Sequence, residues 1–336
     1  MLRFVALRLL ALAGILWALT TIVFLLRTVI PADPARTLAG PGATPELLEI
    51  ERVKLGLDRP LITQYLDYIR GLLHGDLGMS VYSRHPVSHD LANTVPASLE
   101  LLVGAIVVML VLGLALGLLG GSSVRGAGAL RLVMVGGASV PTFLLGLLGL
   151  LLLYSKLHIA PAGGDVSSSL NAPTGPTGVV ALDGLLTLRF NVALDALWHL
   201  ALPAFVLGIG PALVLGRTLQ SSLRSVNGQD YIRTARAKAL TNRSLVLHHA
   251  LRNAVNAPLS LAGLEIGAML AGIAVVEDVF SWPGIGLYTV HAIAASDFAA
   301  IAGVTMVVGT GYIIANAAVD IAQVAADPRL RRWAHA

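Results

Sequence analysis

The sequence contains no cysteine among its 336 residues, and only 12% of the residues are charged. Without cysteine the chain has no disulfide framework, no thiolate metal site and no cysteine nucleophile. Aromatic residues are also few, at 5%, whereas hydrophobic residues make up 56% and the mean hydropathy is +0.78. These values lie outside the range of soluble globular domains, so most of the surface is expected to face lipid.

Long apolar runs account for the high hydropathy. A helix needs roughly 20 mostly apolar residues to cross a bilayer core about 30 Å thick. Six windows come close to that length, namely residues 9–26, 101–121, 132–154, 200–216, 259–277 and 298–319. The first window follows Arg3 and Arg8 but no A-x-A-like cleavage site, so it is interpreted as a retained helix rather than a signal peptide. The sequence therefore predicts an all-α integral membrane protein with six transmembrane helices.

Basic residues concentrate in alternate loops of this predicted topology. With the N-terminus inside, the inner segments hold Arg3, Arg8, Arg125, Arg131, Arg217, Arg224, Arg233, Arg236, Lys238, Arg243, Arg252, Arg329, Arg331 and Arg332. Most acidic residues fall in the opposite segments. The positive-inside rule then places both termini of this multi-pass membrane protein in the cytoplasm.

Two of the predicted external segments are long. Residues 31–98, after an N-terminal segment 1–30 with the first helix, contain helix-compatible pieces, "PELLEIERVKLGL" and "LITQYLDYIRGLLHG", and are expected to form a small folded cap. Residues 155–198 contain "APAGGDVSSSLNAPTGPTG", which favours a mobile loop. The core, with the remaining five transmembrane helices, would then be residues 99–336.

The longest inner loop, residues 217–258, carries a basic helix-like stretch, "DYIRTARAKAL". Asp230 suits a helix N-cap, and no Gly or Pro follows it as far as Leu240. One side of this helix would be small and apolar, with Ile232, Ala235, Ala239 and Leu240. Such a helix could dock in the groove of a soluble partner, or it could be a solvated basic loop that only fixes topology.

Some polar and helix-breaking residues lie within the apolar windows. Glu265 is the one carboxylate well inside such a window, and it either faces a pathway or pairs with a basic group such as Arg217 or Arg252. Prolines can kink membrane helices where neighbours satisfy the freed carbonyls. The residues considered for a translocation pathway are Ser139, Pro141, Glu265 and Glu277.

Catalytic and metal-binding patterns are weak. His248 and His249 are adjacent, so on a helix they point about 100° apart and do not share one ion. The sequence holds neither a Ser, His and Asp constellation suggestive of hydrolysis nor the G-x-x-x-x-G-K-[ST] phosphate loop. No enzyme activity, no metal site and no cofactor are expected in this chain.

Several motifs together resemble one family. "YIRTARAK" and "HALRNA" in the inner loop resemble the EAA loop of ABC importer permeases of the dipeptide and oligopeptide type. Arg233, Thr234 and Ala235 stand where the E-A-A residues would be, and Ala239 stands where a glycine is expected. Further matches, in the order of the family, are "PADPA", "KLGLDRPLITQYLDYI", "GDLGMS", "ANTVPASLELL", "VFSWPGIG" and "DPRLR".

This resemblance implies a type I ABC importer permease fold, alternating access and a place in a bacterial plasma membrane. It implies as partners a second related permease, two cytoplasmic ATPases that bind ATP and Mg²⁺, and an extracytoplasmic binding protein, but no nucleic acid. The implied ATPase-coupling residues are Tyr231, Arg233, Thr234, Ala235, Arg236, Ala237, Lys238, Ala239, Leu240 and Thr241. The cargo would be di- or oligopeptides, with nickel, glutathione or haem-like cargo as alternatives. An ion-coupled secondary transporter and a structural scaffold are rival classes, although the predicted midplane is nearly free of charge.

Overall fold

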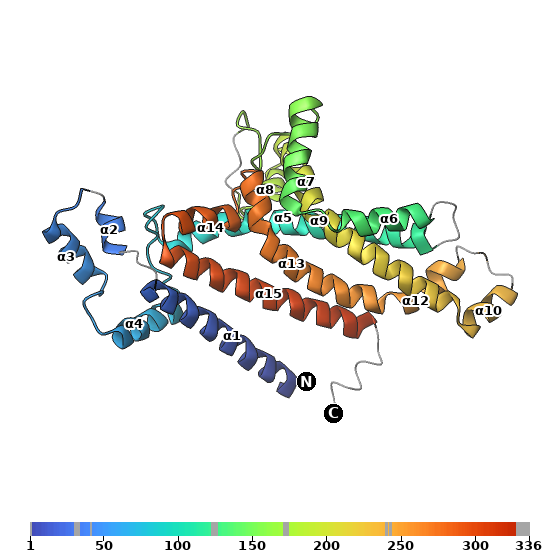
Figure 1. Cartoon of the computed structure of the whole chain (residues 1–336), viewed down its shortest axis with the longest axis horizontal. Coiled ribbons are helices and arrows are strands. Elements are labelled where there is room, and N and C mark those ends of the chain that lie inside the picture. The colour runs from blue at the N-terminus through green and yellow to red at the C-terminus, as the bar shows by residue number, and fades with distance from the viewer. Residues whose placement is uncertain are drawn as a thin grey trace. The chain divides into compact units, whose positions relative to one another are not determined.

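A computed structural model describes residues 2–29, 34–40, 42–121, 127–170, 175–238, 241 and 244–326. These ranges are helical and contain no strand beyond one isolated bridge, between Met79 and Pro86, which confirms the all-α class. The helices are α1 (Leu2–Val29), α2 (Pro34–Ala39), α3 (Pro45–Lys54), α4 (Leu61–Leu73), α5 (Val87–Gly121), α6 (Ala127–Gly137), α7 (Thr142–Gly149), η1 (Leu150–Lys156), α8 (Val180–Leu186), α9 (Phe190–Asn227), α10 (Asp230–Ala237), η2 (Leu245–Ala250), α12 (Leu251–Ala254), α13 (Asn256–Val279), α14 (Ile285–Ala294) and α15 (Phe298–Ala326) (Figure 1).

Four of these helices are long and apolar enough to cross a membrane. They are α5, α9, α13 and α15. Shorter apolar stretches occur at residues 13–26 of α1 and over α7 and η1. The six apolar windows of the sequence thus fall on helical segments, but the third window is not one helix.

The helix predicted over residues 132–154 is interrupted at Pro141. Helix α6 ends at Gly137, a turn follows, and α7 begins at Thr142 with Pro141 as its N-cap residue. Proline has no N–H to donate and disfavours helical dihedrals in the preceding residue, so the second helix restarts after it. By contrast, α9 continues through Pro203 and Pro211 without a break.

The chain forms two compact units. Unit one comprises Leu99–Trp282 and the chain from Tyr312 onward, and unit two comprises Leu2–Ser98 and Pro283–Gly311. Helix α9 is the core of unit one, since 61% of its apolar window is buried, against 33% or less in the other three long helices. Helices α6, α7, α8 and α13 all pack on it.

Small residues bring α5 and α9 into close contact. A methyl group on Gly117 would lie 2.6 Å from Leu219 Cδ2, and one on Gly113 would lie 2.7 Å from Leu215 Cδ2. The contacting positions advance together along both helices, so the two helices run in the same direction. In lipid, where no hydrophobic effect drives helices together, such close packing supplies the attraction.

Unit two contains the predicted cap helices, and α3 and α4 match the two pieces expected to be helical. Its apolar core joins the start of α5 to α14 and α15, through Val87, Leu91, Ile285, Tyr288, Ala292, Ala300 and Val304. The buried carboxylate of Asp297 accepts hydrogen bonds from Ser80 Oγ at 2.6 Å and from the backbone N–H of Val81 at 2.7 Å. The cap thus continues directly into α5, which begins at Val87 rather than near Ser98.

The segment 155–198, expected as a mobile loop, makes fixed contacts where the structure describes it. Gly164 donates its N–H to the Phe280 carbonyl at 2.9 Å. The carboxylate of Asp183 accepts hydrogen bonds from Thr177 Oγ1 at 2.8 Å and from the Gly178 N–H at 2.9 Å. Helix α9 also begins inside this segment, ten residues before the apolar window that marked it in the sequence.

Candidate functional site

The predicted coupling helix corresponds to α10, which is shorter than expected. It runs from Asp230 to Ala237, whereas the sequence predicted helix as far as Leu240. Ala239 and Leu240 lie outside the described residues. Thr241 does not belong to α10; its Oγ1 accepts the backbone N–H of Ser244 at 3.3 Å.

The apolar stripe of α10 packs on its own chain. Ile232 is fully buried and Ala235 is 7% exposed. Both belong to a group that we name the anchor cluster, formed by Leu219, Leu223, Val226, Ile232, Ala235, Leu245, Ala250 and Ala254. In this structure Ile232 and Ala235 are therefore covered by residues of the same chain. Their burial holds α10 against α9 and η2.

A hydrogen bond adds to this attachment. Asn253 Nδ2 on α12 donates to the Tyr231 hydroxyl at 3.0 Å, so the two halves of the inner loop are joined by side chains 22 positions apart. The "HALRNA" motif includes Asn253, but sequence reasoning did not identify its partner. Leu219 and Leu223 were missed as well, because at the end of an apolar span they look like ordinary lipid-facing residues.

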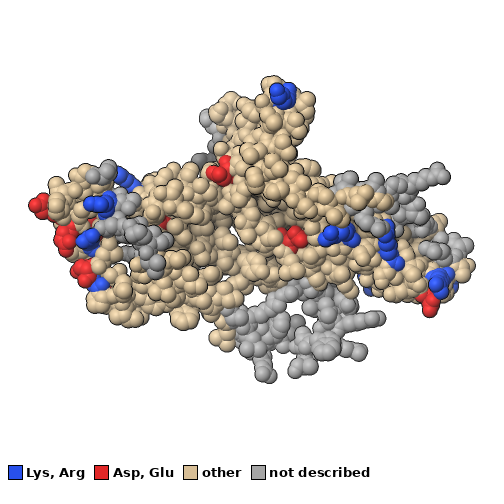
Figure 2. Space-filling view, in the orientation of Figure 1, with Lys and Arg blue, Asp and Glu red and all other residues tan. Residues whose placement is uncertain are grey.

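The face of α10 opposite the anchor cluster is exposed and polar. Asp230, Arg233, Thr234 and Lys238 are exposed, and the Arg233 guanidinium lies 3.4 Å from the Asp230 carboxylate. The side chain of Arg236 lies outside the described residues. Blue and red atoms are visible at the right-hand end of Figure 2, where Figure 1 places α10. The surface offered to a partner is thus charged.

Ser139 and Pro141, two of the four pathway candidates, lie at the break between α6 and α7. Both are exposed, and Ser139 Oγ donates to the Val135 carbonyl at 3.2 Å. Glu277 is fully buried near the end of α13, where its carbonyl accepts the Trp282 N–H at 2.8 Å. In this structure, therefore, Glu277 does not line an open path.

Glu265 is partly buried in the middle of α13. Within the described part of the chain its carboxylate forms neither an ion pair with Arg217 or Arg252 nor a hydrogen bond. Two residues further along α13, a methyl group on Gly267 would lie 2.5 Å from Tyr312 Cε2 of α15, so the two helices approach closely there.

A second polar region was not predicted from the sequence. It combines the described loop 158–170 with the first turns of α9, where Asp195 and His199 stand four residues apart and their side chains approach to 3.4 Å. Burial raises the pKa of the nearby Asp165 carboxyl above its ordinary value, although backbone hydrogen bonds and His199 oppose the shift. The i, i+4 spacing of Asp195 and His199 was the available sequence signal.

Comparisons with known proteins agree with this architecture. A family model described as "Binding-protein-dependent transport system inner membrane component" matches residues 96–332, and its N-terminal counterpart matches residues 1–102. A probable D,D-dipeptide transport system permease of Escherichia coli (strain K12) is 40% identical over 315 residues, which are 93% of this chain and 92% of that protein. The dipeptide transport system permease of the same strain is 36% identical over 337 residues, or 98% and 99% of the two chains. A glutathione transport system permease of Escherichia coli O6:H1 is 35% identical over 334 residues, again 98% and 99%.

Proposed function

Because the chain belongs to the dipeptide and oligopeptide permeases, the inner membrane components of binding-protein-dependent transport systems, we propose that it forms part of a channel that imports short peptides. Its partners would be a second related permease, two cytoplasmic ATPases that bind ATP and Mg²⁺, and an extracytoplasmic binding protein. The near-complete alignment with dipeptide permeases is the observation that carries this proposal. The glutathione permease among the relatives makes that cargo the second candidate.

We assign six membrane crossings to α1, α5, the broken α6–α7–η1 segment, α9, α13 and α15. Both termini and α10 would be cytoplasmic, in accord with the basic inner loops, and residues 31–98 would form an external cap. Each crossing is then an apolar helical segment, and the broken third crossing has its irregular turn at Ala138–Val140. Irregular backbone at membrane depth is tolerated where protein or water surrounds it, which favours a position beside the pathway.

Coupling to the ATPases would pass through α10. Its exposed face, with Asp230, Arg233, Thr234 and Lys238, would contact an ATPase, and the anchor cluster would transmit the movement to α9. A docking element has to be stiffly attached if closure of the ATPase pair is to move the membrane helices. The tight burial of Ile232 supplies that attachment.

The test is to co-express the chain with its second permease and ATPases and to reverse two charges, one on α10 and one in the turn that follows it. In the Arg233→Glu, Lys238→Glu double variant, we expect membrane insertion to persist while binding-protein-stimulated ATP hydrolysis falls at least about tenfold, because charge reversal at a contact is repulsive. Lys156→Glu, a charge reversal at the exposed end of η1, is the matched control. Normal stimulation in the double variant would remove α10 as the ATPase contact.

A further inference from the structure

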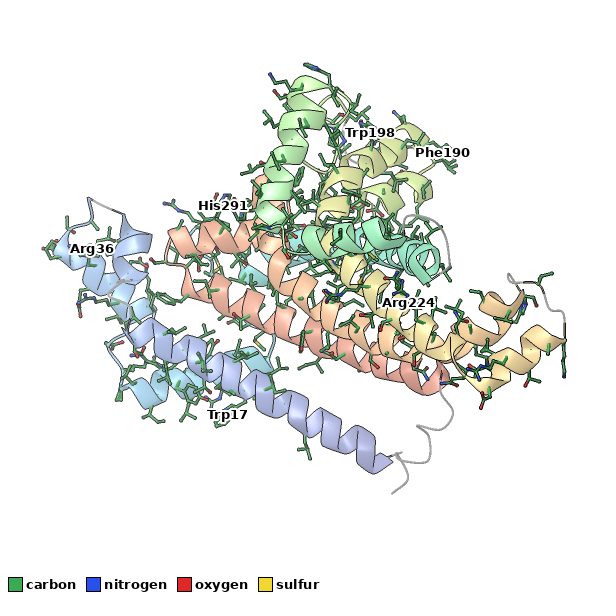
Figure 3. All side chains as sticks on the ribbon, turned by 45° about the vertical axis from the view of Figure 1, so that its right-hand side comes forward. Trp17, Arg36, Phe190, Trp198, Arg224 and His291 are labelled. Atoms are coloured by element: carbon green, nitrogen blue, oxygen red, sulfur yellow. The ribbon has the colours of Figure 1, made fainter. Side chains whose placement is uncertain are left out.

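A groove of about 720 Å³ lies in unit one, between the described loop and the first turns of α9. We call it the outer groove. Its principal polar lining side chains are His158, Ser167, Ser168, Ser169, Asp195 and His199. Trp198 also lines the groove and is 54% exposed; Figure 3 shows it on the part of α9 that starts at Phe190.

The loop that closes one side of the outer groove is fixed in place. Gly163 lies so close to the Phe280 carbonyl that no side chain fits there, and the Gly164 N–H donates to the same carbonyl at 2.9 Å. Gly164 has a φ of +76°, which an L residue rarely adopts. The groove wall is therefore attached to the end of α13.

The carboxylate of Asp195 is oriented by the loop. It accepts the Ser167 N–H at 2.6 Å on Oδ2 and the Ser167 hydroxyl at 2.8 Å on Oδ1. A carboxylate has about four lone-pair positions, so it retains acceptor capacity after these bonds and the 3.4 Å approach of His199 Nδ1. Its side chain is 21% exposed, so a ligand in the groove can contact it.

His199 offers a second acceptor. It is 6% exposed, and its Nδ1 lies 2.9 Å from the Asp195 carbonyl oxygen, which can only accept, so Nδ1 carries the hydrogen. In the neutral ring Nε2 is then an acceptor, and it has no hydrogen-bond partner among the residues that the structure describes. No lysine or arginine appears among the described residues that line the groove.

A carboxylate, an imidazole acceptor and an exposed indole suit a cation that carries several N–H donors. A primary ammonium can donate to both acceptors while an aromatic face attracts its charge. We propose that the outer groove binds the N-terminal ammonium of the imported peptide, with Asp195 and His199 Nε2 as acceptors and Trp198 beside the charge. This inference rests on the proposed peptide import, and it places the first contact of the peptide with this chain at the external end of α9.

The test uses the complete assembly of both permeases, ATPases and binding protein in proteoliposomes. A dipeptide with a free N-terminus and a photoreactive benzoylphenylalanine is irradiated during transport, and labelled fragments are identified by mass spectrometry. We expect labelling within residues 158–169 and 195–199. We expect it to fall about tenfold in Asp195→Asn and several-fold in Trp198→Ala, since a charge-assisted hydrogen bond carries more affinity than one cation–π contact. The N-acetylated probe should label the wild type as weakly as the free probe labels Asp195→Asn.

Matched variants show whether labelling depends on the groove itself. Asp278→Asn and Trp17→Ala remove an exposed carboxylate and an exposed indole outside the groove, and should label like the wild type. Ser167→Ala removes a hydrogen bond that holds the loop but keeps the Asp195 charge. This variant should still be labelled more strongly by the free probe than by the acetylated probe. A purely structural role of Asp195 would not predict that difference. Equal labelling in Asp195→Asn and the wild type would overturn the proposal. The proposal would also be overturned if the Asp195 and Trp198 variants weakened binding of the cargo-free binding protein while peptide labelling stayed normal. The groove would then be a contact for that protein. Failure of peptide import itself appears separately, as absent uptake by the wild-type assembly.

Discussion

Ile232→Ala is the most direct perturbation of the anchor cluster, because this side chain is fully buried and holds an eight-residue helix. Truncating a buried isoleucine costs about 2–5 kcal/mol. A helix of this length is unstable in isolation, so its order depends on such packing. Even a loss of about 2 kcal/mol raises the detached population of α10 roughly thirtyfold, since 1.4 kcal/mol is a factor of ten.

The assay is amide hydrogen exchange over Tyr231–Ala237 in the assembled complex, together with binding-protein-stimulated ATP hydrolysis. We expect protection of these amides to fall by the same thirtyfold or more, and stimulation to fall with it. Ile314→Ala makes the same truncation at a side chain that is 63% exposed on α15, and it should change neither readout. Unchanged protection in Ile232→Ala would refute the claim that the cluster holds α10, and lost protection with full stimulation would refute its role in coupling.

Three further results are expected. Burial raises the pKa of the Asp165 carboxyl in the folded state, so its contribution to stability is present below the unfolded pKa near 3.8 and is lost as the pH rises through the folded pKa. Asp165→Asn should therefore raise the melting temperature of the complex above that of the wild type at pH 7. Near pH 4 this difference in melting temperature should disappear. Glu265→Gln should alter uptake of cationic relative to anionic peptides while ATPase assembly persists, and unchanged uptake of every peptide would exclude a pathway role. Asp297→Asn should lower the melting temperature by several degrees, because an amide has one acceptor oxygen whereas the buried carboxylate accepts hydrogen bonds on both oxygens, from Ser80 and Ala300. An unchanged melting curve would show that the turn at Ser80 does not depend on that charge.

The sequence predicted which segments are helical wherever a long apolar run marks the helix. The apolar windows fall on helices because a segment that contacts lipid must satisfy its backbone internally. The cap helices were predictable as well, from the two helix-compatible pieces of residues 31–98. The structure adds the Thr44 N-cap, whose side chain accepts the Leu47 N–H at 3.3 Å.

Features that depend on tertiary contacts were not predictable in the same way. An apolar stripe such as Ile232 and Ala235 has the same pattern whether it covers its own chain or a partner, and only the position of Leu219 and Leu223 decides between them. The Gly, Pro and Ser content of residues 158–178 indicates a loop but not its attachment to Phe280 and Asp195, because those partners lie far away in the sequence. The break at Pro141 was foreseen only as a kink, since Pro203 and Pro211 leave their helix uninterrupted.

Helix α9 is a single rod of 38 residues, about 57 Å long at 1.5 Å per residue. Its first turns carry Asp195 and His199, and its last turns carry Leu223 and Val226 of the anchor cluster, so the outer groove and the seat of α10 lie about 40 Å apart on one helix. Figure 3 shows this separation between Trp198 and Arg224. A tilt imposed at one end is therefore transmitted to the other, because α9 continues without a break through Pro203 and Pro211. A bound peptide that favours one tilt of α9 therefore changes the free energy of ATPase binding. Binding of the ATPase changes the free energy of peptide binding by the same amount, because coupling between two sites is reciprocal.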